Sequence, residues 1–111
     1  MDGPSPLATS PDRKALRRIG LVYVSDAEPG ICRERRGLGF CYRMPDGALV
    51  RDRQTLDRIR SLGLPPAYEK VWICIRENGH LQATGFDVRG RKQYRYHDGW
   101  QEWRSERKFG E

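Results

Sequence analysis

In one segment near the middle of the chain, apolar residues recur at the spacing of an amphipathic helix. Leu56, Ile59 and Leu62 fall on one side of such a helix, and charged residues, mainly arginines, lie between them. Asp52 is well placed to cap the first turn, and a glycine followed by two prolines ends the pattern. The spacing predicts a helix over Asp52–Leu62 with its charges on a solvated face.

Two further helices are expected nearer the ends of the chain. Asp12 is a candidate cap for a short basic helix over Arg13–Ile19. The segment Asp98–Phe109 contains mostly helix-tolerant residues, with its first residue as the expected cap and with Trp100 and Trp103 on one face. Because little else in the sequence is available to cover these tryptophans, we expect the last helix to be exposed.

The second half of the chain alternates strand-like runs with turns. Val71–Ile75 is the most apolar and β-branched run and is predicted to be a central strand. Asn78–Gly79 is a strong hairpin signal that leads into a strand over Leu81–Phe86. A second turn over Asp87–Gly90 then leads into a strand over Arg91–Tyr96. These runs predict three antiparallel strands connected in sequence.

Shorter strands are expected in the first half of the chain. Leu21–Val24 is one, and Phe40–Arg43 and Ala48–Arg51 flank the turn signal Pro45–Gly47. With the helices, these elements predict an α+β fold: an antiparallel β-sheet of about five or six short strands with two or three short helices.

The segment Ser25–Gly39 is predicted to be a loop, because it contains a Pro-Gly break and several charged residues. Arg33, Arg35 and Arg36 cluster within it. Two interpretations remain open at this point: a solvated loop, or a second edge that contacts phosphates.

The charge balance indicates affinity for polyanions. The 111 residues carry a formal net charge of +6, and the sequence pI is about 9.6. Most of the cations are arginines, whose planar guanidinium matches phosphates and base edges. Nucleic acid, anionic membranes and acidic proteins all remain possible partners on this ground alone.

Length and composition suit one small domain over residues 12–109, preceded by a proline-rich, disordered tail over residues 1–11. The sequence contains neither a transmembrane-length apolar run nor the pattern of a secretory signal, so a cytoplasmic location is expected. Cys32, Cys41 and Cys74 lie far apart, which favours reduced, partly buried thiols over disulfides or a zinc site.

The most distinctive stretch is the basic and aromatic run Arg89–His97. Alternation along a strand places Lys92, Tyr94 and Tyr96 on one face. The opposite face then carries Arg91, Gln93, Arg95 and His97. Neither face is apolar, which is unusual for a strand that adjoins a core.

Two interpretations of this stretch compete. One is an edge strand whose charges keep the sheet soluble. The other is a strand that enters a nucleic-acid groove, where Gln93 reads an adenine edge, arginines contact guanine or phosphate, and tyrosine hydroxyls donate to phosphate. We favour the second, because the preceding Arg-Gly turn adds cations at the same end.

Catalysis by this chain alone is not indicated. Its histidines are His80, expected to make a structural hydrogen bond, and His97, and neither has the spacing of a Ser-His-Asp or Cys-His site. Asp87 and Asp98 are expected to be turn and cap residues, although a small metal-dependent nuclease built on them is conceivable. We therefore predict no catalytic residue, no metal site and no cofactor.

Four segments together resemble a known family. They are VWICIRENGHLQATGFDVRGRKQYRYHDGW, YVSDAEPGICRERRGLGFCYR, DRQTLDRIRSLGLPPAY and WRSERKF. They resemble the N-terminal domain of bacterial, poxvirus-like type IB DNA topoisomerases, and the resemblance covers roughly Leu21 to Phe109.

The resemblance implies a function. Type IB enzymes relax supercoiled DNA without ATP or metal by cutting one strand with a tyrosine, through a 3′-phosphotyrosyl intermediate. The N-terminal domain closes over the duplex opposite the catalytic domain and contacts the major groove. The expected partners are double-stranded DNA and the protein's own catalytic domain, in a monomeric bacterial enzyme associated with the nucleoid.

The resemblance also implies which residues contact DNA. The family's groove-facing strand matches the positions from the Arg-Gly turn to the second tyrosine of the QY-x-Y pattern. The predicted DNA-binding residues are Arg89, Gly90, Arg91, Lys92, Gln93, Tyr94, Arg95 and Tyr96. Phe86 departs from the pattern, because a basic residue usually stands there.

The family's catalytic residues lie in a following domain that this chain is not expected to contain. The 111 residues should therefore be an inactive part of an isomerase. The alternative is an independent module for RNA or single strands that uses Tyr94, Tyr96 and the tryptophans as stacking platforms.

Overall fold

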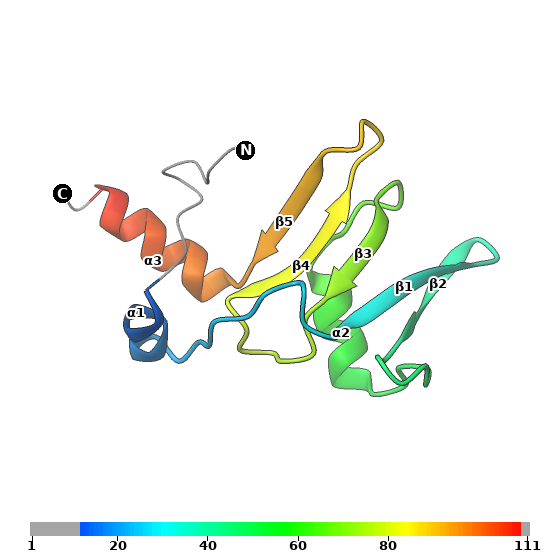
Figure 1. The fold of residues 1–111 in the computed structure, drawn as a ribbon, viewed down its shortest axis with the longest axis horizontal. Helices are drawn as coiled ribbons and strands as arrows, with labels where there is room; N and C mark the ends of the chain where they lie inside the picture. Colours follow the sequence, from blue (N-terminus) through cyan, green and yellow to red (C-terminus); the bar gives the residue numbers. More distant parts are fainter. Residues whose placement is uncertain (1–11, 110–111) are drawn as a thin grey trace.

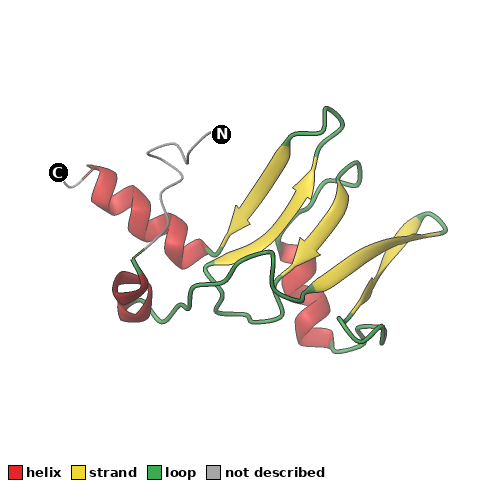
Figure 2. Ribbon diagram, viewed as in Figure 1, coloured by secondary structure: helices red, strands yellow, loops and turns green. Residues whose placement is uncertain are grey.

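The protein folds as a five-stranded antiparallel sheet with three helices (Figures 1 and 2). The computed structural model describes the backbone of residues 12–109 and the side chains of residues 12–106, so the predicted N-terminal tail lies outside the described residues. The strand order is β2-β1-β3-β4-β5. The elements are α1 Arg13–Arg18, β1 Ile31–Arg36, β2 Gly39–Arg43, α2 Arg53–Ser61, β3 Glu69–Ile73, β4 Leu81–Phe86, β5 Lys92–Tyr96 and α3 Asp98–Phe109. The predicted α+β class is confirmed.

Helix α2 covers one face of the sheet. Its Ile59 packs against Ile31, Val71, Ile73 and Ala83, which are all buried. The predicted cap is confirmed, since an Asp52 carboxylate oxygen accepts the Thr55 N–H at 2.9 Å. We call this side of the sheet the α2 face and the opposite side the outer face.

The prediction that all the arginines of α2 are solvated is wrong for Arg58. Its guanidinium donates to Gln82 Oε1 at 2.6 Å and to the Cys74 carbonyl at 2.8 Å. Partial burial lowers the pKa of this guanidinium from its ordinary value, yet it remains a cation at neutral pH. Arg58 therefore ties α2 to the end of β3 and the start of β4.

The predicted loop before β2 is wrong, because Ile31–Arg36 is strand β1. It pairs with β2 from Cys32 opposite Arg43 to Arg36 opposite Gly39, around a turn in which Gly37 has a φ of +59°. The run is rich in arginine, but the Arg33 guanidinium lies 4.1 Å from the centre of the Phe40 ring. This cation–π contact across the strand pair gives the charged side chain a partner that its own sequence neighbourhood does not show.

Two other predicted strands reduce to single bridges. In the segment 21–24, Val22 bridges Gly79 in parallel, and Leu49 bridges Arg43 across the Pro-Asp-Gly turn. The segment 21–24 takes its hydrogen bonds from the loop after β3, where the Asn78 carbonyl accepts the Val22 N–H at 3.0 Å. The backbone of this segment is therefore hydrogen-bonded to that loop and is not a strand of the sheet.

The Asn78–Gly79 signal does not form a tight two-residue hairpin, since neither residue has a positive φ. β3 and β4 are joined instead by a longer loop. Gly79 is buried there, and a Cβ on it would lie 2.6 Å from Cys74 Sγ. The glycine is thus needed for close packing rather than for a turn conformation.

The predicted exposure of the last helix is wrong for its tryptophan face, although Gln101, Glu102 and Ser105 are exposed. Trp100 is 6% exposed and packs with Leu16 of α1 and with Leu21. Figure 2 shows α1 and α3 together at one end of the molecule. Its cap also differs from the prediction, because His97 Nδ1 accepts the Gly99 N–H at 2.9 Å. In the part of the chain that the structure describes, no helix combines the length and apolar character needed to cross a membrane.

Candidate nucleic-acid interface

Strand β5 pairs with β4, as predicted, and among the residues that the structure describes it has no second neighbour, so it is an edge strand (Figure 1). Thr84 lies opposite Tyr94, and Ala83 lies opposite Arg95. Since Ala83 packs against α2, Arg95 belongs to the α2 face and Tyr94 to the outer face. The predicted alternation along this strand is therefore confirmed.

The outer face of β5 is a row of one cation and two aromatic rings. The rings of Tyr94 and Tyr96 are nearly parallel, with 6.1 Å between their centres. Lys92 Nζ lies 5.5 Å from the centre of the Tyr94 ring and 6.0 Å from that of Phe86. Tyr94 is 46% exposed, so part of its side chain is accessible to a ligand.

Tyr96 is more enclosed than Tyr94. Burial raises the pKa of its phenol, against a smaller opposing effect of the nearby Arg104 guanidinium. That guanidinium lies 5.7 Å from the centre of the Tyr96 ring. A neutral hydroxyl with a cation beside it is suited to donate a hydrogen bond to a phosphate.

Lys92 has an acidic partner that sequence reasoning missed. Its Nζ lies 2.5 Å from Asp26 Oδ2, and Thr84 Oγ1 donates to the same oxygen at 3.1 Å. The hydrogen bond with Asp26 raises the pKa of Lys92. Asp26 belongs to the segment before β1, and no local pattern could have indicated that it reaches β5.

The turn between β4 and β5 is organised by Asp87. Its Oδ1 accepts the backbone N–H groups of Arg89 and Arg91 at 2.9 Å each. Gly90 follows with a φ of +78°, which glycine adopts without strain. The guanidinium of Arg89 has no acidic partner within residues 12–106, so this turn presents a cation to solvent. The predicted turn is confirmed.

Side chains of two predicted DNA contacts also reach Asp87. Its Oδ2 accepts Arg91 Nε at 3.1 Å and Gln93 Nε2 at 3.0 Å. The pKa of this carboxyl is lowered, first by the hydrogen bond from the Arg91 backbone, so it is ionised at neutral pH. One carboxylate therefore orients the side chains of both Arg91 and Gln93.

Arg95 lies apart from the other predicted contacts. Its Nε donates to the Leu62 carbonyl at 3.1 Å, and a terminal nitrogen lies 3.4 Å from the Gly63 carbonyl. These carbonyls follow the end of α2, where a cation is favourable. Arg95 fastens β5 to α2 in this structure.

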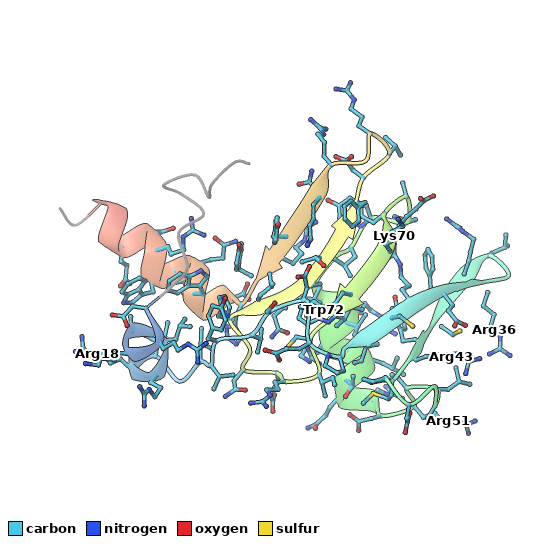
Figure 3. All side chains as sticks on the ribbon, viewed as in Figure 1. Arg18, Arg36, Arg43, Arg51, Lys70 and Trp72 are labelled. Atoms are coloured by element: carbon cyan, nitrogen blue, oxygen red, sulfur yellow. The ribbon has the colours of Figure 1, made fainter. Side chains whose placement is uncertain are left out.

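The arginines of β1 mostly have structural partners. A terminal nitrogen of Arg33 donates to the carbonyls of Pro65 and Tyr68 at 2.9 Å each. Arg35 contacts the Pro66 carbonyl at 3.3 Å. Arg36 is exposed near the tip of the β1–β2 hairpin (Figure 3). Neither interpretation raised by the sequence describes Arg33, which anchors the segment before β3.

Trp72 and Trp100 do not form an open platform for stacking. The Trp72 indole donates to the Glu28 carbonyl at 2.9 Å on the outer face (Figure 3), and Trp100 is buried. His80 makes the predicted structural bond, since its Nδ1 accepts the Val24 N–H at 3.1 Å. Among residues 12–109, no cluster of three His, Cys, Asp or Glu side chains could hold a metal ion.

Comparison with known proteins identifies relatives of the middle of the chain. Residues 39–87 match the family model of the bacterial DNA topoisomerase IB N-terminal domain. The resemblance to this family that was inferred from the sequence is therefore confirmed over this segment. The match runs from β2 to the end of β4, so all the predicted DNA contacts lie just beyond it.

A viral relative shows the same similarity. The chain is 41% identical over 69 residues to DNA topoisomerase 1B of Acanthamoeba polyphaga mimivirus, a region that covers 62% of this chain. The matched region is 20% of the relative's length. The chain thus spans only a small part of the relative that it matches.

Proposed function

We propose that this domain binds double-stranded DNA as the clamp half of a type IB topoisomerase. The catalytic domain, with the tyrosine that cuts and reseals one strand, is then a separate part of the enzyme. In this proposal residues 12–109 act as one binding unit, catalyse nothing by themselves and work in a monomeric enzyme on chromosomal DNA.

One observation carries the proposal: the free edge of β5 and the turn before it present cations and tyrosines together. Arg89 is exposed at the turn, Lys92 and Tyr94 line the outer face, and the Gln93 side chain, on the opposite face of β5, is bonded to Asp87. A two-stranded ribbon fits the major groove edge-on, so side chains of both faces can flank the bases. The match to a topoisomerase domain agrees with a duplex as the ligand.

A titration of the chain with a short duplex tests the proposal. The backbone amide chemical shifts of the segment 89–97 should change most, and log Kobs should fall with log salt by about 0.9 per neutralised phosphate. Arg89→Ala should reduce that slope by about one phosphate. Arg18→Ala, at an exposed site on α1, is the matched control and should leave the slope unchanged (Figure 3).

Two results would contradict the proposal. One is a set of shifts confined to α1, α2 or the β1–β2 hairpin. The other is clear preference for single-stranded DNA or RNA over duplex in a competition assay, which would favour the stand-alone module. The buried Trp100 and the bonded Trp72 already deprive that module of two of its stacking platforms.

A further inference from the structure

Asp87 divides its hydrogen bonds between two oxygens with different tasks. Oδ1 accepts only backbone N–H groups, from Arg89 and Arg91, and so closes the turn. Oδ2 accepts only side-chain donors, from Arg91 Nε and Gln93 Nε2. Oδ1 of Asp87 therefore stabilises the turn, and Oδ2 orients the side chain of Gln93.

An ionised carboxylate can accept hydrogen bonds but cannot donate them. The group of Gln93 that faces Asp87 must therefore be its NH₂, and this fixes which way round the amide lies. The Gln93 carbonyl oxygen Oε1 accepts no hydrogen bond from the residues that the structure describes. Since no buried side-chain oxygen among them lacks a partner, this carbonyl is open to solvent.

We propose that Asp87 is a positioning residue that fixes the amide of Gln93 so that β5 presents a hydrogen-bond acceptor to the major groove. This inference rests on the proposed function. In the major groove, adenine N6 and cytosine N4 are donors, whereas guanine and thymine present acceptors at the corresponding positions. The base that Gln93 faces is therefore read as adenine or cytosine.

Asp87→Asn reverses the amide while keeping the turn. Asparagine retains an oxygen at the Oδ1 position for the two backbone N–H groups, but places an NH₂ where Oδ2 stood, so the hydrogen bond from Arg91 Nε is lost. Gln93 must then turn its carbonyl toward residue 87 and its NH₂ toward the groove. The preference at that base should change to guanine or thymine.

The double variant that combines Asp87→Asn with Gln93→Glu provides the matched control. The NH₂ at residue 87 then donates to a carboxylate at residue 93, whose other oxygen again presents an acceptor. The total charge of the pair is unchanged. The double variant should therefore recover the preference for adenine or cytosine, a recovery that a purely structural role of Asp87 does not produce.

The experiment measures the affinity of the chain for a panel of duplexes that differ by one base pair at each position in turn. Wild type should favour adenine or cytosine at one position by about threefold or more. Asp87→Asn should reverse that preference, and the double variant should restore it. Gln93→Met, which keeps the length but not the hydrogen bonds, should abolish it.

Failures of the two hypotheses are distinguishable. Duplex binding with the same base preference in wild type and Asp87→Asn overturns this inference alone, as does an unchanged preference in Gln93→Met. Absence of duplex binding by the wild-type chain overturns the proposed function together with it. Should Asp87→Asn unfold, the double variant and Gln93→Met still decide the outcome.

Discussion

At the scale of single residues, buried polar side chains in this domain hold neighbouring segments together by hydrogen bonds. His80 is 4% exposed and lies between the rings of Tyr23, Tyr96 and Trp100, with its ring stacked on Tyr23 at 5.0 Å between centres. Its Nδ1 accepts the Val24 N–H, so it must be unprotonated at that atom. The histidine thereby holds the segment 21–24 against the start of β4.

The stability of the domain should consequently fall in mild acid. Burial lowers the pKa of His80 from its ordinary value of 6.5, and a hydrogen bond with the Val22 backbone raises it by a smaller amount. The unfolded chain binds the proton more readily than the folded chain. The contribution of neutral His80 to the free energy of unfolding is therefore complete above pH 6.5. It should decline as pH falls from there toward the lower folded-state pKa.

Urea denaturation at several pH values between neutrality and mild acid measures this decline. His80→Gln replaces the ring by a side chain that can accept the same N–H but does not titrate in this range. Its free energy of unfolding should be lower at neutral pH and should vary less over the same interval. An equally steep decline in His80→Gln would assign the pH dependence to other groups.

At the scale of elements, the loop before β1 holds Lys92, one of the residues proposed to contact DNA. Asp26 forms an ion pair with Lys92, which in the proposed complex would contact a phosphate instead. Under that proposal, DNA has to displace the Asp26 carboxylate before Lys92 can contact a phosphate. Because the pair is partly exposed, its strength is on the order of 0.2–1 kcal/mol.

Asp26→Asn should strengthen duplex binding about two- to fivefold at low salt, because it frees Lys92. The side-chain carbonyl of the introduced asparagine can still accept the Thr84 hydroxyl, so the loop should keep its place. Asp46→Asn removes the same charge from an exposed turn and can keep the bond to the Ala48 N–H, which makes it the matched control. Equal gains in both variants, measured by fluorescence anisotropy, would show a general effect of charge.

The elements that sequence could predict are those whose contacts are local or periodic. Helix α2 and strands β3 and β4 follow from apolar spacing, and β5 from its position after a turn. β1 was missed because Arg33 is stabilised by Phe40 across the pair and by carbonyls before β3, which its own neighbourhood does not reveal. The candidate site followed the same rule, since its strand was predicted, whereas the pairing of Asp26 with Lys92 was not.

At the scale of the whole molecule, the domain is elongated and has more than one core. It measures 48 × 31 × 22 Å. One core lies between the sheet and α2, around Ile59, and another lies between α1 and α3, around Trp100. Tyr96, at the end of β5, packs against the α1–α3 core and also against the intermediate cluster around Val24. The proposed DNA-binding strand therefore lies between the core under α2 and the core between α1 and α3.

This division predicts that the two ends unfold with different ease. Trp100→Ala should cost about 3–5 kcal/mol locally, because it removes a large buried ring from the α1–α3 core. In native-state hydrogen exchange, protection should fall most in α1, the segment 21–24 and α3, and least in β3 and β4, which lie against α2. Trp103→Ala, at a half-buried ring stacked on Trp100, should cost less and serves as the control.

The consequence for function follows from where β5 lies. If the α1–α3 end opens separately, Trp100→Ala should weaken duplex contacts at Tyr96 while the turn carrying Arg89 still responds to DNA. Amide shifts on duplex addition can distinguish these two ends of the strand within one spectrum. A uniform loss of protection over all strands and helices, with loss of binding at both positions, would instead mean that the cores fold as one cooperative unit.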